Sequence, residues 1–231
     1  MSSAFDLASV VPWGRNRAEY FSFFDLSALS SNGVGKLRIL DCAAGPASFN
    51  AEMTAMGWPV VSVDPLYVFS APDIAARIEA TRGDIMAGLL AAKDRFAWHD
   101  YGDPEAVEVI RLSAMKFFLK DFDDGLVEGR YRAANLPDLP FADYSFDLAL
   151  CSHFLFLYSG QLDLNFHLAA IDEMLRLAPE ARIFPLLDLD GNPSVYLDPV
   201  IKVLREKGRT CEVLRVPYEF QKGGNEMLKI S

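Results

Sequence analysis

No stretch of this sequence reaches the roughly 18 uninterrupted apolar residues of a membrane-spanning helix. The first residues lack the basic region and apolar core of a secretory signal. Lysine and arginine do not cluster among aromatic residues, and the formal net charge is −10. These absences argue against a membrane protein, a secreted protein and a polyanionic partner. We therefore expect a cytoplasmic protein that binds no nucleic acid.

Histidine and cysteine are scarce, with three of each. The histidines are not paired at helical spacing, and the cysteines lack the spacing of metal ligands, so we expect no metal site. Cys42, Cys151 and Cys211 each lie in or beside an apolar run. That placement is typical of reduced, buried thiols.

What the sequence does have is a large apolar fraction, 51%, beside a charged fraction of 23%. This composition is typical of a globular protein, and 231 residues suit one domain with a full core. We therefore treat residues 1–231 as a single domain that carries an insertion.

The segment from Leu37 to Phe49 joins an apolar run to a series of small residues after Asp41. The run 37–40 predicts a buried strand. A helix is predicted to hold Pro46 in its first turn and to end before Gly57. A small-residue loop between a strand and a helix brings backbone N–H groups close to a ligand. The alternative is an ordinary strand–turn–helix whose small residues serve close packing.

The run 60–63 predicts a second buried strand, and Asp64 follows it directly. Asp64 lies 23 residues after Asp41, close to the spacing of about 20 expected for a carboxylate that binds ribose in a Rossmann-like unit. The alternative is a solvated residue at the end of a strand.

Residues 70–129 form an insertion between the second and third strands, where a dozen residues would complete the crossover. Apolar spacing predicts one helix over 72–96, and Asp103-Pro104 begins a second that runs to about residue 122. The insertion is either an additional helical layer or a lid over a substrate site. Residues 1–35 are expected to form a helical cap, with a helix from Arg17 that buries Tyr20, Phe21 and Phe24.

Strands are also predicted over 130–134, 146–151 and 182–188, the last of which must bulge or pair only in part at Pro185. Helices are predicted from Asp163, with His167 on the flank, and over 198–208. The chain is expected to end in a β-hairpin formed by 211–220 and 225–230.

His153 follows the fourth predicted strand directly. Ligands of doubly wound sheets bind outside the carboxyl ends of strands. His153 is therefore a candidate general base, or else a histidine that bonds a backbone group. Tyr158 is a second candidate near the same place, and Asp188 and Asp190 are expected to border it.

Three motifs in this order resemble those of class I S-adenosylmethionine (SAM) dependent methyltransferases. They are Asp41-Cys-Ala-Ala-Gly45-Pro-Ala47, the acidic Asp64, and the segment Asn135-Leu-Pro-Asp-Leu-Pro-Phe-Ala-Asp-Tyr-Ser-Phe-Asp147. The family pattern has glycine at Ala43 and Ala47, and aspartate at Asn135. The phrases 12–15, 151–158 and 216–224 further resemble a bacterial group of methyltransferase-like proteins.

The resemblance implies an α/β fold, a doubly wound Rossmann-like sheet that is mostly parallel with an antiparallel C-terminal hairpin strand. It also implies SAM as cofactor, with Arg15 pairing to its carboxylate. The other implied cofactor-binding residues are Asp41, Ala43, Ala44, Gly45, Asp64, Pro65, Leu66, Asn135, Leu136 and Ser152. Candidates for contact with the substrate are Trp13, His153 and Tyr158.

We therefore expect methyl transfer from SAM to a small-molecule acceptor by in-line displacement. One alternative is a SAM-binding or regulatory protein of the same fold without catalytic activity, which the two alanines and Asn135 favour. A second is an NAD(P)-dependent oxidoreductase, which would not be expected to end in an antiparallel hairpin.

Overall fold

The computed structural model describes residues 13–27 and 36–231, and the rest of the predicted N-terminal segment lies outside these ranges. The described residues form a seven-stranded sheet of order β3-β2-β1-β4-β5-β7-β6. β7 is antiparallel to both of its neighbours, whereas the other pairs are parallel. The strands are β1 Ile39–Cys42, β2 Val60–Val63, β3 Tyr131–Arg132, β4 Leu148–Ser152, β5 Ala181–Phe184, β6 Cys211–Arg215 and β7 Glu226–Ile230. The predicted sheet is confirmed.

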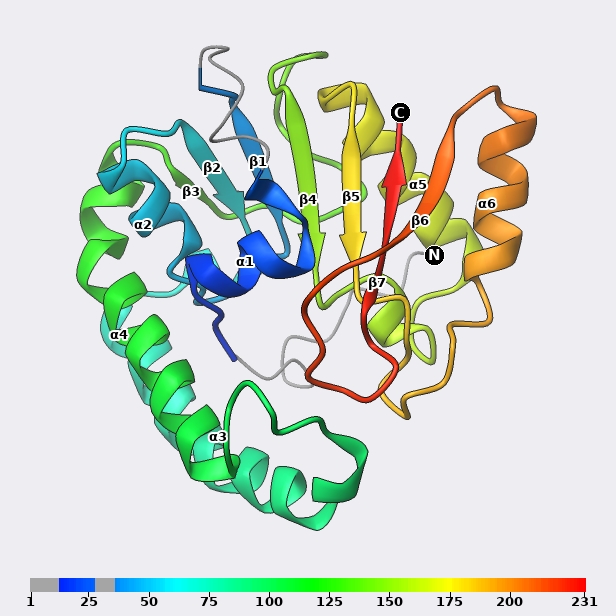
Figure 1. Ribbon diagram of the computed structural model, residues 1–231. Helices are drawn as coiled ribbons and strands as arrows, with labels where there is room; N and C mark the ends of the chain where they lie inside the picture. Colours follow the sequence, from blue (N-terminus) through cyan, green and yellow to red (C-terminus); the bar gives the residue numbers. More distant parts are fainter. Residues whose placement is uncertain (1–12, 28–35) are drawn as a thin grey trace.

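Helices cover both faces of this sheet (Figure 1), with α1 and α2 on one face and α5 and α6 on the other. The α-helices are α1 Arg17–Phe23, α2 Phe49–Ala55, α3 Ala71–Ala91, α4 Pro104–Val127, α5 Leu164–Leu177 and α6 Leu197–Glu206. Single turns of 3₁₀ helix in the described residues include η3 Pro65–Val68, η4 Lys93–Arg95 and η5 Phe156–Tyr158. No helix in the described ranges is long and apolar enough to cross a bilayer.

The side chains of β1 alternate between two cores, as the period of a strand requires. Leu40 and Cys42 pack with the helices α5 and α6, whereas Ile39 packs with α1 and α2. Asp41 points to the same face as Ile39, where its side chain is fully buried. A carboxylate buried at this position needs polar partners, and it is the starting point for the site described below.

The insertion between β2 and β3 is a pair of long helices. Ser70 and Asp103 cap α3 and α4 through their side chains, and a proline lies in the first turn of each helix. Inward-facing residues of both helices form a third apolar cluster with Tyr67 and Tyr131. Local capping signals and apolar spacing thus account for both helices.

The loop between α3 and α4, residues 92–103 (here the insertion tip), lies beyond the ends toward which the parallel strands point (Figure 1). There it docks on the loop between β6 and β7, residues 216–225 (the C-terminal arm). The N–H of Ala97 donates to the carbonyl of Phe220 at 2.7 Å, and the N–H of Lys222 donates to the carbonyl of Arg95 at 2.9 Å. Phe96 also stacks on Phe220, with 4.8 Å between ring centroids. The insertion tip and the C-terminal arm therefore form one joined layer.

Several element boundaries differ from the prediction. Pro46 lies in the loop before α2 rather than in its first turn, because the helix begins only after Ser48. β5 ends at Phe184, and the pairing beyond it stops at Pro185, which has no N–H to donate. β3 is two residues long, and the hairpin strands are shorter than predicted because the C-terminal arm turns toward the insertion tip.

Two side chains also differ in burial from the prediction. In α1 the fully buried partner of Tyr20 and Phe24 is Phe23, whereas Phe21 is only half-buried. His167 is buried rather than on the flank of α5, and its ring bonds the carbonyls of Asp163 and Leu155. Its role is structural, as the sequence indicated.

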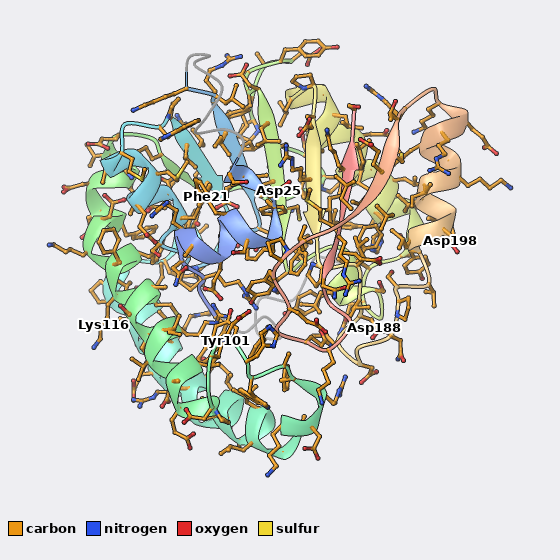
Figure 2. The ribbon with its side chains drawn as sticks, viewed as in Figure 1. Phe21, Asp25, Tyr101, Lys116, Asp188 and Asp198 are labelled. Carbon is orange, nitrogen blue, oxygen red and sulfur yellow. The ribbon has the colours of Figure 1, made fainter. Side chains whose placement is uncertain are left out.

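A buried ion pair between Glu19 of α1 and Arg111 of α4 joins the insertion to the rest of the fold. Tyr101 of the insertion tip donates to Glu19 at 2.6 Å, and its hydroxyl oxygen lies 3.0 Å from that of Tyr218 in the C-terminal arm. Figure 2 shows Tyr101 on the side of the insertion tip that faces the sheet. Burial raises the pKa of Glu19, but Arg111 outweighs this effect and holds it below its usual value. Glu19 is thus ionised and compensated by donors from three separate parts of the chain.

Replacement of Arg111 by methionine is expected to lower the free energy of unfolding by about 3–5 kcal/mol, because it leaves the Glu19 carboxylate buried without its cation. The matched control is Lys207→Ala, which removes an exposed ion pair with Asp172 and is expected to change stability by less than about 1 kcal/mol. Urea denaturation followed by fluorescence measures both. Equal effects of the two variants would contradict a stabilising role for the buried pair.

Candidate functional site

The carboxyl ends of β1 and β2 bring the small-residue loop and Asp64 together. The N–H of Gly45 donates to Oδ2 of Asp64 at 2.8 Å, and the N–H of Leu66 donates to Oδ1 at 2.7 Å. Desolvation raises the pKa of the half-buried Asp64 to about 6, although these two hydrogen bonds act in the opposite direction. Each carboxylate oxygen retains a lone pair for a further donor.

The loop after β1 contains two residues in the left-handed backbone region. Gly45 has φ +55° and Ala43 has φ +52°. An added side chain at Gly45 would meet no atom within 4 Å, so the backbone of the loop borders open space there. The N–H of Ala44 anchors the loop by donating to the carbonyl of Val63 at 3.3 Å. Ala43 thus adopts a backbone conformation that glycine takes more readily, at a cost of about 1–2 kcal/mol.

Asp41 lies beneath this loop and is fully buried. Its carboxylate accepts from the hydroxyl of Tyr20 at 3.2 Å and from the hydroxyl of Ser62 at 3.2 Å. Burial raises the pKa of Asp41 to about 8, with a further contribution from the charge of Asp64. The carboxylate of Asp41 is thus held by the hydroxyl groups of Tyr20 and Ser62.

The N-terminal segment lies directly against the same loop. A side chain at Gly14 would meet the carbonyl oxygen of Pro46 at 2.1 Å, so only glycine permits this approach. The carbonyl of Arg15 accepts from the N–H of Ser48 at 3.0 Å, just before α2. The segment that holds Arg15 is thereby fixed to the loop that holds Gly45.

The guanidinium of Arg15 is only partly satisfied. Nη1 donates to the carbonyl of Trp13 at 3.0 Å, whereas Nε is buried without a hydrogen-bond partner. Among the described residues no carboxylate forms an ion pair with Arg15. Burial and the neighbouring charge of Arg111 lower the pKa of Arg15. The unpaired donor makes Arg15 a candidate ligand for an anion.

His153 follows β4 and also has a positive φ, +53°. Its backbone N–H donates to the carbonyl of Phe184 at 2.6 Å, and the centroid of its ring lies 5.3 Å from the ring centroids of both Phe23 and Phe184. Nδ1 lies 3.3 Å from the hydroxyl oxygen of Ser152. Burial, together with Arg15 and Arg111, holds the pKa of His153 well below its usual value. His153 is thus a neutral imidazole at pH 7.

The other predicted residues lie at the same edge or close to it. Asn135 is exposed in a tight turn and donates to the carbonyl of Leu136 at 3.1 Å, whereas Leu136 is buried with the core that contains Cys42 and Val63. Pro65 begins η3 directly after Asp64. Tyr158 ends η5, and the charge of Arg15 acts on its hydroxyl.

Trp13 is half-buried between the apolar cluster of the insertion and that of α1 and α2. Asp188 accepts from the N–H groups of Asp190 and Asn192 in a turn after β5. Figure 2 shows Asp188 at the same end of the sheet as Tyr101. The three cysteines are free and buried, as expected. Within the described ranges no cluster of histidine, cysteine, aspartate and glutamate suits a metal ion.

The sequence did not reveal the polar residues that support this edge, namely Glu19, Tyr20, Tyr101, Arg111 and Tyr218. Glu19 and Arg111 are 92 residues apart, and each occupies a helix position where a solvated charge is the ordinary expectation. A single local signal was available, the capping box that Asn16 forms with Glu19.

The strand order, the antiparallel β7 and the loop beside Asp64 define the chain as a Rossmann-like α/β protein with the class I methyltransferase fold. It belongs to the family of the uncharacterized protein MJ0045 of Methanocaldococcus jannaschii, which is 34% identical over 228 residues and 97% of each chain. No protein-family model matches the chain.

Three solved structures illustrate the more distant likenesses. Magnesium protoporphyrin IX methyltransferase (ChlM) from Synechocystis PCC 6803, with bound SAH, is 12% identical, with TM-score 0.48 and coverage of 100% of this chain and 89% of that one. The PH0226 protein from Pyrococcus horikoshii OT3 is 11% identical, with TM-score 0.47 and coverage of 93% of this chain and 90% of that one. A SAM-dependent methyltransferase from Bacteroides fragilis, in complex with S-adenosyl-L-homocysteine, is 14% identical, with TM-score 0.44 and coverage of 92% of this chain and 78% of that one. At these values the fold assignment rests on the strand order of this chain.

Ala43→Gly is expected to leave stability unchanged or to raise it by about 1 kcal/mol, because relief of the left-handed strain offsets the greater backbone entropy of glycine. Ala44→Gly is the matched control, since Ala44 is buried and is not among the positive-φ residues. It is expected to lower stability by about 1 kcal/mol. Thermal and urea unfolding compare the two, and equal losses would contradict strain at Ala43.

Proposed function

We propose that this protein transfers the methyl group of SAM to a small-molecule acceptor. The observation that carries this proposal is the contact of Gly45 with Asp64, which places an open backbone loop beside a half-buried carboxylate at the ends of two adjacent strands. Such a pair fits a nucleoside, since the free lone pairs of Asp64 can accept from both ribose hydroxyls. An ordinary close-packed turn would not leave the open space that lies at Gly45, and this space can admit a ligand.

The remaining residues suit the other parts of the cofactor. Asn135 and Leu136 would border the adenine, with an amide oxygen at Asn135 able to accept from the adenine amino group. Arg15 has an unpaired donor for the carboxylate. The cofactor supplies a methyl group already activated by a sulfonium, so positioning rather than strong acid catalysis is the principal task of the protein.

A small acceptor is supported by the layer that covers this edge. The insertion tip and the C-terminal arm are joined by backbone hydrogen bonds, and the ion pair of Glu19 with Arg111 fastens the insertion to α1. A covered edge excludes water and admits a compact substrate more readily than a macromolecule. The charge of −10 further disfavours a nucleic-acid substrate.

A SAM-binding protein without catalytic activity is the second candidate, and the strained Ala43 in place of glycine favours it. We expect SAM and S-adenosylhomocysteine to raise the thermal unfolding midpoint, because each binds only the native state. NAD is expected to cause no shift. A response to NAD alone would indicate an oxidoreductase, and no response to any of the three would contradict a cofactor site.

Affinity for S-adenosylhomocysteine is expected to depend on the ionisation of Asp64. The pKa of about 6 means that Asp64 is protonated in the free protein below pH 6, whereas ribose hydroxyls bind best to the carboxylate. Affinity is therefore expected to fall about tenfold from pH 7 to pH 5. The same shift makes the free protein lose stability as the pH rises from about 4 to 6.

Isothermal titration calorimetry at several pH values measures this dependence. Asp64→Asn is expected to lower affinity at least tenfold at pH 7 and to abolish the proton release on binding between pH 4 and 6. The control is Asp123→Asn, an exposed carboxylate on α4, which is expected to bind as the unsubstituted protein does. Unchanged affinity in Asp64→Asn would contradict the role given to Asp64.

A further inference from the structure

Three large apolar side chains that are about half exposed or more lie around one groove on the outer side of the insertion. Val109 and Phe117 of α4 are 66% and 47% exposed, and Met56 at the end of α2 is 49% exposed. Together with Ala18 and Ile110 they line a groove of about 640 Å³ between α4 and the helices α1 and α2. An exposed apolar surface of this kind marks a place where another molecule binds.

The groove continues along α4 as an exposed stripe. The exposed side chains of this stripe recur every three or four residues, which places them on one face of the helix: Val109, Ser113, Phe117 and Lys120. Arg111 points to the opposite face, where it pairs with Glu19. Helix α4 runs along the outer edge of the molecule (Figure 1), and Figure 2 shows Lys116 directed away from the sheet. A partner can therefore reach this face of α4 without disturbing the buried ion pair.

The charges along this face make α4 complementary to a reversed copy of itself. Glu105 precedes Ser113 by eight residues, whereas Lys120 follows it by seven. At about 1.5 Å per residue, the two charges lie about 12 Å and 10 Å from Ser113 in opposite directions. An antiparallel copy of α4 centred on Ser113 would therefore place its lysine beside Glu105 and its glutamate beside Lys120. A parallel copy would instead bring like charges together.

The apolar residues match in the same antiparallel register. Val109 and Phe117 lie four residues from Ser113 on either side, so Val109 of one copy would lie at the level of Phe117 of the other. Ser113 is a small residue, and two packed helices lie about 8–10 Å apart, depending on the side chains at their contact. Phe117 of each copy would then cover part of the groove of the other copy beside Ile110.

We propose that the face of α4 around Ser113 is the interface of a symmetric homodimer, in which α4 of a second copy occupies the groove. The dimer has two-fold symmetry, so each contact occurs twice. The charged and the apolar residues agree on one register, and this agreement identifies the occupant as a second copy of the chain. The dimer does not depend on methyl transfer, because its residues lie outside the site at the ends of β1 and β2.

Sedimentation equilibrium of the full chain between about 1 and 200 µM tests the proposal. We expect a reversible dimer, with twice the mass of one chain at the upper concentrations. Phe117→Glu is expected to raise the dissociation constant at least about a hundredfold, because it places a charge in the centre of an apolar contact. The matched control is Val195→Glu in the turn before α6, where Val195 is 71% exposed. This control is expected to dimerise as the unsubstituted protein does.

Charge reversal at low salt, where exposed charges are screened least, tests the register. Glu105→Lys alone and Lys120→Glu alone each bring like charges together at both ends of the interface. Each is expected to raise the dissociation constant about tenfold. An equimolar mixture of the two variants is expected to form a heterodimer with nearly the original affinity, because every glutamate then faces a lysine. A mixture that associates no better than either variant alone would contradict the antiparallel register.

Cross-linking between copies tests the position of the two-fold axis. The two copies of Ser113 meet at this axis, so Ser113→Cys is expected to form a disulfide between copies under mild oxidation. The control is Asp124→Cys, also on an exposed position of α4, whose copies would lie about 33 Å apart and beyond the reach of a disulfide. The native cysteines are buried and do not compete. If Ser113→Cys formed no more disulfide than Asp124→Cys, the register would be wrong.

Two outcomes would overturn the dimer itself. The first is the mass of a single chain at every concentration, which would leave the groove to another protein or to another part of this chain. The second is a dimer that persists in Phe117→Glu with an unchanged far-ultraviolet circular dichroism spectrum, which would place the interface elsewhere. Thermal shift with SAM tests the cofactor site separately, so failure of the dimer and failure of the proposed function are distinguishable.

Discussion

The ion pair between Glu19 and Arg111 is the interaction on which the arrangement of the site depends. Burying two charges is favourable only when each finds a full set of partners. Glu19 finds them in Arg111, in the hydroxyls of Tyr101 and Tyr218, and in the N–H of Asn16. Helix α1, the insertion and the C-terminal arm must therefore meet at one point for the chain to fold with this charge inside.

The same turn of helix supports the interior of the site, because Tyr20 follows Glu19 directly. Fixing Glu19 against the insertion sets the rotation of α1, and that rotation places the hydroxyl of Tyr20 over Asp41. The covering layer and the hydrogen bond of Tyr20 to the buried Asp41 thus depend on one short helix. A substitution that loosened the insertion would change the rotation of α1 and so weaken the hydrogen bond of Tyr20 to Asp41, although no residue of the insertion touches Asp41.

Local signals in the sequence were sufficient for much of this fold. The caps at Ser70 and Asp103 and the apolar runs of β1 and β2 depend on neighbours in the chain, and the helices and strands that they predict are present. The spacing of Asp64 from Asp41 placed a carboxylate beside the loop after β1, where it meets Gly45. These features need no knowledge of tertiary packing.

The features that escaped prediction are those that tertiary contacts decide. Nothing near Arg111 in the sequence reports that its helix position faces Glu19, and nothing near Ala43 reports a left-handed backbone. His167 follows the period of its helix, but Leu155 from a distant turn supplies the acceptor that makes its burial favourable. A prediction from periodicity assumes that a polar side chain faces solvent, whereas at these positions the folded chain supplies a hydrogen-bond or ion-pair partner.

The charges at the edge of the sheet set the ionisation of His153 and the binding capacity of Arg15. Burial and the guanidinium groups of Arg15 and Arg111 keep the imidazole of His153 neutral. Glu19 compensates Arg111, whereas Arg15 has an unpaired donor that suits an anionic group.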